Sequence, residues 1–231
     1  MKTYVDYADI EDMEMAANCR RDRLLIRLLS RLGCRISEAL SIKVQDIDFE
    51  RKTITILHLK RNIRLCCLNC GARLGRSHQF CPGCGTVIGD AIKSQQERRR
   101  IRVLPIDEGT VDMIRRYLSL NKLNEDNGPA PLFCLNRHRA WQIVRHCAQQ
   151  AGVPDLVNPE TGRVRGVSPH SLRDAFSVHA MKLDDSGDAL RLLQQHLGHA
   201  SFDTTARYRK IAGEEHREWY DRLWNESQQS F

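Results

Sequence analysis

Two short motifs near the C-terminus limit the folds open to this chain, because they place reactive side chains within forty residues of one another. His170-Ser171-Leu172-Arg173 is followed by Leu197-Gly198-His199 and then by Thr204-Thr205-Ala206-Arg207-Tyr208. A phenol, two imidazoles and a guanidinium supply a nucleophile, a proton acceptor and donors for charge that grows at phosphorus. The fold must therefore bring these side chains together if they act on a phosphodiester.

A helix is predicted to carry His170 and Arg173. Ser168 can accept a hydrogen bond from the free amides of the first turn, and Pro169 suits the first helical position. The i, i+3 spacing puts His170 and Arg173 on one face, where both can hold oxygens of the same phosphate.

Two more helices are predicted downstream. Residues 189–197 form a helix that Gly198 ends, and Asp203 can cap a third helix that carries Tyr208 in its second turn. His199 then lies in the turn between helices, a position from which its side chain can enter a site.

An earlier arginine stands in a similar bend. Residues 21–32 carry leucines on one face and predict a core helix that Gly33 ends. Ser37-Glu38 begins a short helix through Ile42, which leaves Arg35 between the two. A guanidinium in such a bend can point into a cleft.

A small antiparallel sheet is predicted among the helices. Three segments are predicted as strands, 44–48, 53–59 and 100–105, with β-branched residues alternating in the second and a similar alternation in the third. Further helices are predicted over 107–120 and 139–151, with a loop over 154–167. The predicted fold class is α+β and mainly helical.

Four cysteines between the second and third strands have metal-ligand spacing. Cys67-Leu68-Asn69-Cys70-Gly71 and Cys81-Pro82-Gly83-Cys84-Gly85 predict two knuckles whose thiolates, Cys67, Cys70, Cys81 and Cys84, bind one structural Zn²⁺. Cys66 competes with Cys67 in register, but Cys67 has the two-residue spacing. The site is closed by four protein ligands, so we interpret residues 64–90 as an inserted zinc ribbon that takes no part in chemistry.

The charge of the chain favours a polyanionic partner. The formal net charge is +7 and the pI is near 9.0, with basic clusters at 20–31, 60–76 and 98–102. Double-stranded DNA is the predicted partner, and Arg61, Arg64, Arg73 and Arg76 are predicted to extend its contact through the ribbon. No apolar run has the length of a membrane span, and we predict a cytoplasmic, nucleoid-associated protein with no membrane partner.

The order of the motifs resembles the catalytic domain of the tyrosine recombinases, the phage-integrase and Xer-type enzymes. Arg35-Ile36-Ser37-Glu38, His170-x-x-Arg173, Leu197-Gly198-His199 and a tyrosine nine residues after that histidine stand in the family's order. The resemblance covers residues 4–209 outside the ribbon. It implies a catalytic domain over 1–231 that the ribbon interrupts. The family's N-terminal core-binding domain is expected to be absent, with a separate core-binding subunit or the ribbon in its place.

The resemblance also implies the roles of the site residues. Tyr208 would attack the scissile phosphate to give a 3′-phosphotyrosyl link and a free 5′-hydroxyl, with no cofactor in the chemical step. Arg35 and Arg173 would hold the non-bridging oxygens, His170 would accept the phenol proton, and His199 would hydrogen-bond the phosphate.

In the family, a lysine in the hairpin of the small sheet protonates the leaving 5′-oxygen. Lys60, directly after the second strand, matches that position best, and Lys93 before the third strand is the alternative. The predicted activity is site-specific recombination or integration. It is expected from a homo-tetramer on DNA that assembles through the C-terminal helix, residues 213–231.

Two other functions fit parts of the sequence. Residues 24–47 resemble a helix-turn-helix, so a non-catalytic zinc-ribbon DNA-binding protein is one alternative. A type IB topoisomerase-like enzyme that cuts one strand with the same chemistry is the other. The first forms no covalent adduct, and the second relaxes supercoils without joining new partners.

Overall fold

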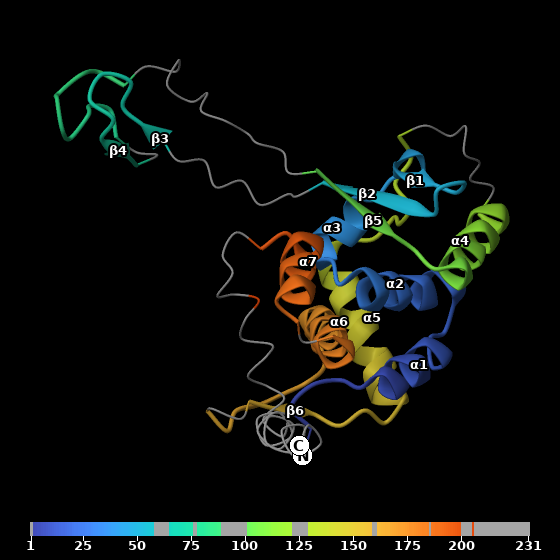
Figure 1. Ribbon diagram of the computed structural model, residues 1–231. Coiled ribbons are helices and arrows are strands. Elements are labelled where there is room, and N and C mark those ends of the chain that lie inside the picture. Colours follow the sequence, from blue (N-terminus) through green and yellow to red (C-terminus); the bar gives the residue numbers. More distant parts are fainter. Residues whose placement is uncertain are drawn as a thin grey trace, which may run out of the picture. The chain divides into compact units, whose positions relative to one another are not determined.

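The computed structural model describes residues 2–57, 65–75, 78–88, 101–121, 129–158, 161–184, 186–199 and 205. Its contacts divide the chain into two compact units (Figure 1). The main unit comprises Met1–Leu57 and Ile101–Phe231, and the inserted unit comprises His58–Arg100. The predicted class is confirmed, because the main unit is mostly helical around a small antiparallel sheet.

Helix α2, Arg20–Leu32, is the centre of the main unit (Figure 1). It packs against α1 (Tyr7–Met15), α3 (Ile36–Ser41), α4 (Glu108–Leu120), α5 (Arg137–Gln150) and α6 (Pro169–Leu183). The leucine face predicted from the sequence is fully buried, as its members show: Leu24, Leu25, Leu28, Leu29 and Leu32. Burial of these side chains provides much of the hydrophobic stabilisation of the unit.

The sheet has the order β1-β2-β5 and is antiparallel throughout. Its strands are β1 (Ile47–Asp48), β2 (Thr53–Leu57) and β5 (Ile101–Pro105). The strand predicted over 44–48 was mostly wrong, because Val44–Asp46 form a 3₁₀ turn in which the Asp46 carboxylate accepts the Lys43 amide. In β5 the inward positions are Arg102 and Leu104.

Helices α4 and α5 begin at side-chain caps. Asp107 accepts the Thr110 amide at the start of α4, as predicted. Asn136 accepts the Arg139 amide, so α5 begins two residues before the predicted start.

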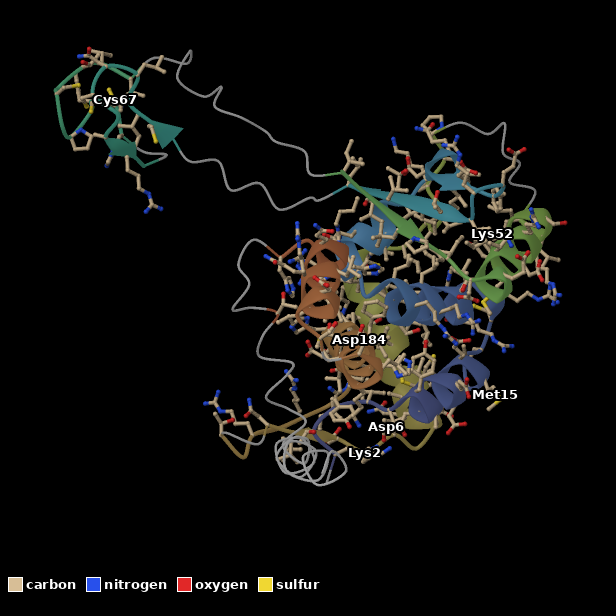
Figure 2. All side chains as sticks on the ribbon, in the orientation of Figure 1. Lys2, Asp6, Met15, Lys52, Cys67 and Asp184 are labelled. Atoms are coloured by element: carbon tan, nitrogen blue, oxygen red, sulfur yellow. The ribbon has the colours of Figure 1, made fainter. Side chains whose placement is uncertain are left out.

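The predicted loop 154–167 contains a short hairpin instead, β6 (Leu156–Val157) with β7 (Val164–Arg165). The N-terminal segment joins it through a bridge between Lys2 and Leu156. Lys2 also forms ion pairs with Asp6 and Asp9 at the start of α1, and Lys2 and Asp6 lie close together in Figure 2.

Helices α6 and α7 (Gly187–Leu197) confirm the predictions for the C-terminal motifs. Ser168 caps α6, Pro169 is its first residue, and Gly198 ends α7 with a φ of +66°. The two helices share a small apolar core that includes Val178, Leu193 and Leu197.

The inserted unit is small and built around its cysteines. Strands β3 (Leu65–Cys66) and β4 (Arg73–Leu74) pair, and Phe80 pairs with Val87. Cys67, Leu74 and Cys81 form its buried cluster. Across the described parts of both units, no helix combines the length and apolar character that a bilayer crossing demands.

Candidate active site and metal centre

The bend between α2 and α3 positions the first predicted site residue. Gly33 ends α2 in the left-handed region, with a φ of +54°. A Cβ at this position would lie 2.5 Å from Cδ1 of Phe176, so both the backbone and the packing require glycine. Arg35 is then the N-cap of α3, with its side chain 34% exposed, as the predicted position in a bend requires.

Arg173 is a buried guanidinium, 1% exposed. Its Nη1 donates to the carbonyl of Gly33 at 2.6 Å, and its Nη2 donates to the carbonyl of Leu197 at 2.9 Å. These acceptors stand at the C-terminal ends of α2 and α7, where carbonyls lack helical partners and attract cations. One positive charge thus joins two helix ends at the place where the sequence motifs converge.

His199 lies beside Arg173, and its hydrogen bonds define the tautomer. Nη2 of Arg173 is 2.9 Å from Nε2 of His199, and a guanidinium can only donate. Nε2 is therefore the acceptor, and Nδ1–H donates to Oγ1 of buried Thr205 at 2.9 Å. In this arrangement His199 is neutral.

His170 occupies the first turn of α6, three residues before Arg173. Its side chain is 57% exposed, and Nε2 lies 3.8 Å from a carboxylate oxygen of Asp174. Asp174 is also 3.7 Å from the guanidinium of Arg165. The i, i+3 pair is thus placed on one helix as predicted, but Arg173 is directed into the protein and His170 is near solvent.

Two residues that sequence reasoning missed connect this site. Glu38, 1% exposed, accepts from Arg35 Nη1 at 3.0 Å and from Arg102 Nη2 at 2.8 Å. Arg102 Nη1 also donates to the carbonyl of His196 in α7. No local signal marked Arg102, because the alternation predicts Ile101 and Val103 to face inward, whereas those two are exposed and Arg102 and Leu104 face inward.

Burial keeps two nearby groups neutral. His196 stacks on Phe176, and Nε2–H donates to the carbonyl of Leu32 at 3.0 Å. Burial lowers the pKa of His196, and the positive charges of Arg102 and Arg173 add to this effect. Burial also raises the pKa of the Cys34 thiol to about 12.

The remaining predicted catalytic residues are not among those described. Lys60, its alternative Lys93, and the nucleophile Tyr208 lie outside the described residues, as does the predicted C-terminal helix over 213–231. The structure therefore brings Arg35, Arg173 and His199 to one region, with His170 one helical turn from Arg173.

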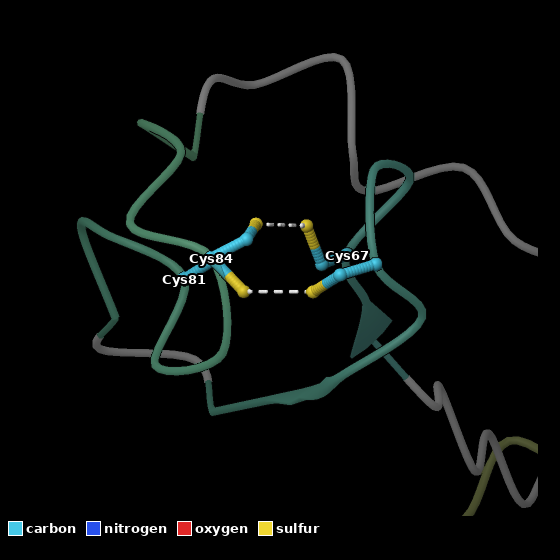
Figure 3. Close-up of side chains that lie close together, drawn as sticks. Cys67, Cys81 and Cys84 are labelled. Carbon is cyan, nitrogen blue, oxygen red and sulfur yellow. Dashed lines mark hydrogen bonds between the residues drawn. The ribbon is translucent and has the colours of Figure 1, made fainter.

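The four predicted metal ligands converge in the inserted unit. Their sulfur atoms all lie within 4.8 Å of one another. Two of these contacts are drawn as dashed lines in Figure 3: the sulfur atoms of Cys67 and Cys84 are 3.6 Å apart, and those of Cys70 and Cys81 are 3.5 Å apart. A tetrahedron with Zn–S bonds of about 2.3 Å has sulfur atoms about 3.8 Å apart, so this donor set can hold a metal ion.

The backbone of the two knuckles supports the sulfurs. Gly71 and Gly85 have φ values of +72° and +69°, which lets the chain turn after each cysteine pair as predicted. The Gly83 amide donates to Cys81 Sγ at 3.3 Å. The hydroxyl of Thr86 lies 3.1 Å from Cys84 Sγ and lowers the pKa of that thiol to about 6. Such contacts favour thiolates, the form that binds metals.

Comparison with known proteins gives one family and a consistent fold. The family model described as the phage integrase family matches residues 5–69 and 77–215. The tyrosine recombinase XerA of Pyrococcus horikoshii is 24% identical over 218 residues, which are 91% of this chain and 57% of that protein. The chain thus spans about half the length of the curated relatives it matches.

Two solved structures share the fold. The crystal structure of XerA recombinase superposes with a TM-score of 0.64 at 21% identity, covering 97% of this chain and 66% of the other. XerH site-specific recombinase bound to the palindromic difH substrate, in a post-cleavage complex, gives 0.60 at 19% identity, covering 95% and 52%. The family match extends over both arginine motifs and both histidine motifs of the site, and on this evidence the chain belongs to the phage integrase family.

Proposed function

We propose that this protein cuts and rejoins DNA at specific sites through a 3′-phosphotyrosyl intermediate. The observation that carries the proposal is the meeting of Arg35, Arg173 and His199 around the end of α2, in a chain of the phage integrase family. Two guanidinium groups from distant parts of the sequence match the charge that develops on a pentacoordinate phosphorus.

The proposed step conserves phosphoester bonds. The Tyr208 hydroxyl oxygen attacks phosphorus, the bond from phosphorus to the 5′-oxygen breaks, and the DNA becomes joined to the protein through its 3′-phosphate. His170 takes the phenol proton, and Lys60 gives a proton to the 5′-oxygen. The reverse reaction with a 5′-hydroxyl from another strand completes recombination, with no energy source beyond the phosphotyrosyl link.

The hydrogen bond from Arg173 to His199 sets a condition on the proposed contact between His199 and the phosphate. Nε2 accepts from Arg173, so donation from Nε2 to a phosphate oxygen requires that this contact break and that Nε2 carry a proton, in the other neutral tautomer or in the imidazolium. A phosphate anion in the site would favour that proton, because an adjacent negative charge stabilises the imidazolium.

DNA is the proposed partner. XerH, a relative in fold, is bound to its difH substrate. In this chain the inserted unit has nine lysines and arginines against two acidic residues, a net charge of +7. The main unit has 27 of each and is neutral. The excess positive charge of the protein thus belongs to the inserted unit, which supports a role for that unit in holding the phosphate backbone.

Zinc is the proposed metal of the inserted unit. Cys67, Cys70, Cys81 and Cys84 would hold Zn²⁺, which supplies structure to a unit with a very small apolar core. The tetrahedral thiolate set leaves no coordination position for substrate. The catalytic step is proposed to need no cofactor.

Strand exchange between two duplexes requires four active sites. We extend the proposal to four protomers on DNA at the nucleoid, associated through residues 213–231. Mass photometry of the protein with its recombination site tests this, since a C-terminally truncated variant should form smaller complexes. Complexes of unchanged mass would contradict it.

The decisive experiment is recovery of the covalent adduct. Cells that express the tagged protein are lysed in denaturing detergent, the protein is purified, and attached DNA is sequenced, which also reveals the target. Wild type should carry DNA at a defined sequence, and Tyr208→Phe should carry none. Tyr117→Phe is the matched control, because Tyr117 is a buried core tyrosine in α4.

The recovered sequence then allows a cleavage assay on a nicked duplex. Wild type should form an adduct that Arg35→Ala and Arg173→Ala lose. An adduct that persists in Tyr208→Phe, or no adduct with wild type on any recovered sequence, would falsify the proposal. Relaxation of plasmids without joined products would instead identify a topoisomerase-like activity.

A further inference from the structure

Arg102 links three elements that carry the site. It stands on β5, yet its side chain is only 8% exposed and reaches away from the sheet. Nη2 donates to Glu38 in α3, and Nη1 donates to the carbonyl of His196 in α7. The same side chain fills the space beside Gly198, where an added Cβ would lie 3.0 Å from Nε.

Glu38 transmits the position of Arg102 to Arg35. Oε2 of Glu38 accepts from Arg102 and, at 2.9 Å, from the backbone amide of Arg35. Oε1 accepts from Nη1 of Arg35 at 3.0 Å. The carboxylate therefore lies between two guanidinium groups, and loss of the Arg102 bond would remove one of the hydrogen bonds that fix its orientation.

The contacts with α7 act on the other half of the site. His196 and Gly198 flank Leu197, whose carbonyl holds Arg173. His199 follows at once and accepts from Arg173. Arg102 thus supports the turn from which His199 enters the site.

A role in protein stability alone explains the contacts of Arg102 less well than a role in positioning the site. Nε of Arg102 is buried and, within the described part of the chain, lacks a hydrogen-bond partner. Buried charges of this kind add little net stability, and apolar side chains often replace them without loss. Its bonded partners, by contrast, all belong to the elements that hold the site residues.

We propose that Arg102 is a positioning residue that sets Arg35, through Glu38, and the His199 turn, through α7, for phosphoryl transfer. The inference rests on the proposed function and names a residue that the chemistry itself does not use. It predicts that Arg102 affects the rate of strand cleavage while DNA affinity stays near wild type.

The test compares Arg102→Lys and Arg102→Met with Arg27→Met in the cleavage assay. Lysine keeps the charge but cannot donate to Glu38 and the His196 carbonyl in the same planar geometry. Both Arg102 variants should cleave about 10²-fold more slowly, as expected from a misplaced catalytic group. Arg27 is the matched control: it is a mostly buried arginine with two ion pairs, to Glu14 and Asp107. Its loss should lower stability and leave the cleavage rate unchanged.

A double-mutant cycle separates positioning from structure. If Arg102 acts on Arg35 through Glu38, the Arg102→Lys and Glu38→Gln effects on the cleavage rate are strongly non-additive. Additive effects, or wild-type cleavage by folded Arg102→Lys, overturn the inference while the proposed function stands.

A reaction-independent measurement covers the case in which wild type does not cleave. The ¹⁵N signal of the Arg35 guanidinium should shift in Arg102→Lys and stay in place in Arg27→Met. Equal spectra would refute the inference on its own, whereas a shift without cleavage would count against the proposed function alone.

Discussion

Replacement of Gly33 by alanine tests whether the end of α2 is as constrained as the structure indicates. Two costs combine at this position. A non-glycine residue in the left-handed region costs about 1–2 kcal/mol. The new methyl group would also lie 2.5 and 2.9 Å from the Phe176 ring and 3.1 Å from Leu197, which forces repacking at about 1–3 kcal/mol. The total loss is about 2–5 kcal/mol.

Gly152→Ala is the matched control. Gly152 has a φ of +69° at the end of α5, but nothing lies within 4 Å of the position of an added Cβ. The free energy of unfolding of Gly152→Ala should therefore fall only by the backbone cost of about 1–2 kcal/mol. Urea unfolding followed by circular dichroism measures both variants, and their difference isolates the steric cost.

The same substitution should also impair chemistry. The Gly33 carbonyl accepts from Arg173 at 2.6 Å, so a shift of this residue moves a proposed catalytic guanidinium. Strand cleavage should fall in Gly33→Ala and not in Gly152→Ala. Equal unfolding free energies for the two variants would refute the packing argument, whatever their activities.

Three other predictions follow from the caps, the metal centre and the buried histidine. The purified protein should contain about one Zn²⁺ per chain by elemental analysis, and Cys81→Ser should lose it; a full complement of zinc in that variant would rule out the four-cysteine site. Because burial lowers the pKa of His196, the unfolded state binds the proton more readily, so the free energy of unfolding should fall as pH drops below about 6.5, by up to about 1.4 kcal/mol per pH unit. His196→Gln should flatten that slope in denaturation series, and an unchanged slope would assign it to other groups. Ser168→Ala removes the α6 cap and should cost about 1 kcal/mol in thermal melts; an unaltered melting temperature would show that the cap adds nothing.

The helices of the site could be predicted from sequence because their signals are local. Ser168 and Pro169 begin α6, and Gly33 and Gly198 end α2 and α7, each within a few residues of the side chain it positions. The metal ligands could also be predicted, since two Cys-x-x-Cys spacings identify all four cysteines. In these cases the residues that determine the local structure lie within a few positions of one another in the sequence.

One error was local, and another arose where residues far apart in the sequence make contact. Residues 44–46 were predicted as part of a strand, but the Asp46 side chain closes a 3₁₀ turn on the Lys43 amide. The hairpin of β6 and β7 lies in a stretch rich in proline and glycine, and it pairs with the N-terminal segment far away in sequence.

The connection between Glu38 and Arg102 spans 64 positions. Alternation in β5 predicts Ile101 and Val103 to face inward, but they are exposed, and Arg102 faces inward to meet Glu38. Local sequence thus predicted the parts of the site and not the contacts that hold them together.

The last ladder pair of β2 and β5 joins Leu57 to Ile101, which are the residues that border the inserted unit. The chain leaves the sheet and re-enters it at adjacent points, as it would through an ordinary tight turn. Closing a longer excursion between such ends costs little extra entropy. This end of the hairpin is therefore a position at which one inserted unit can be exchanged for another while the pairing of β2 with β5 stays the same.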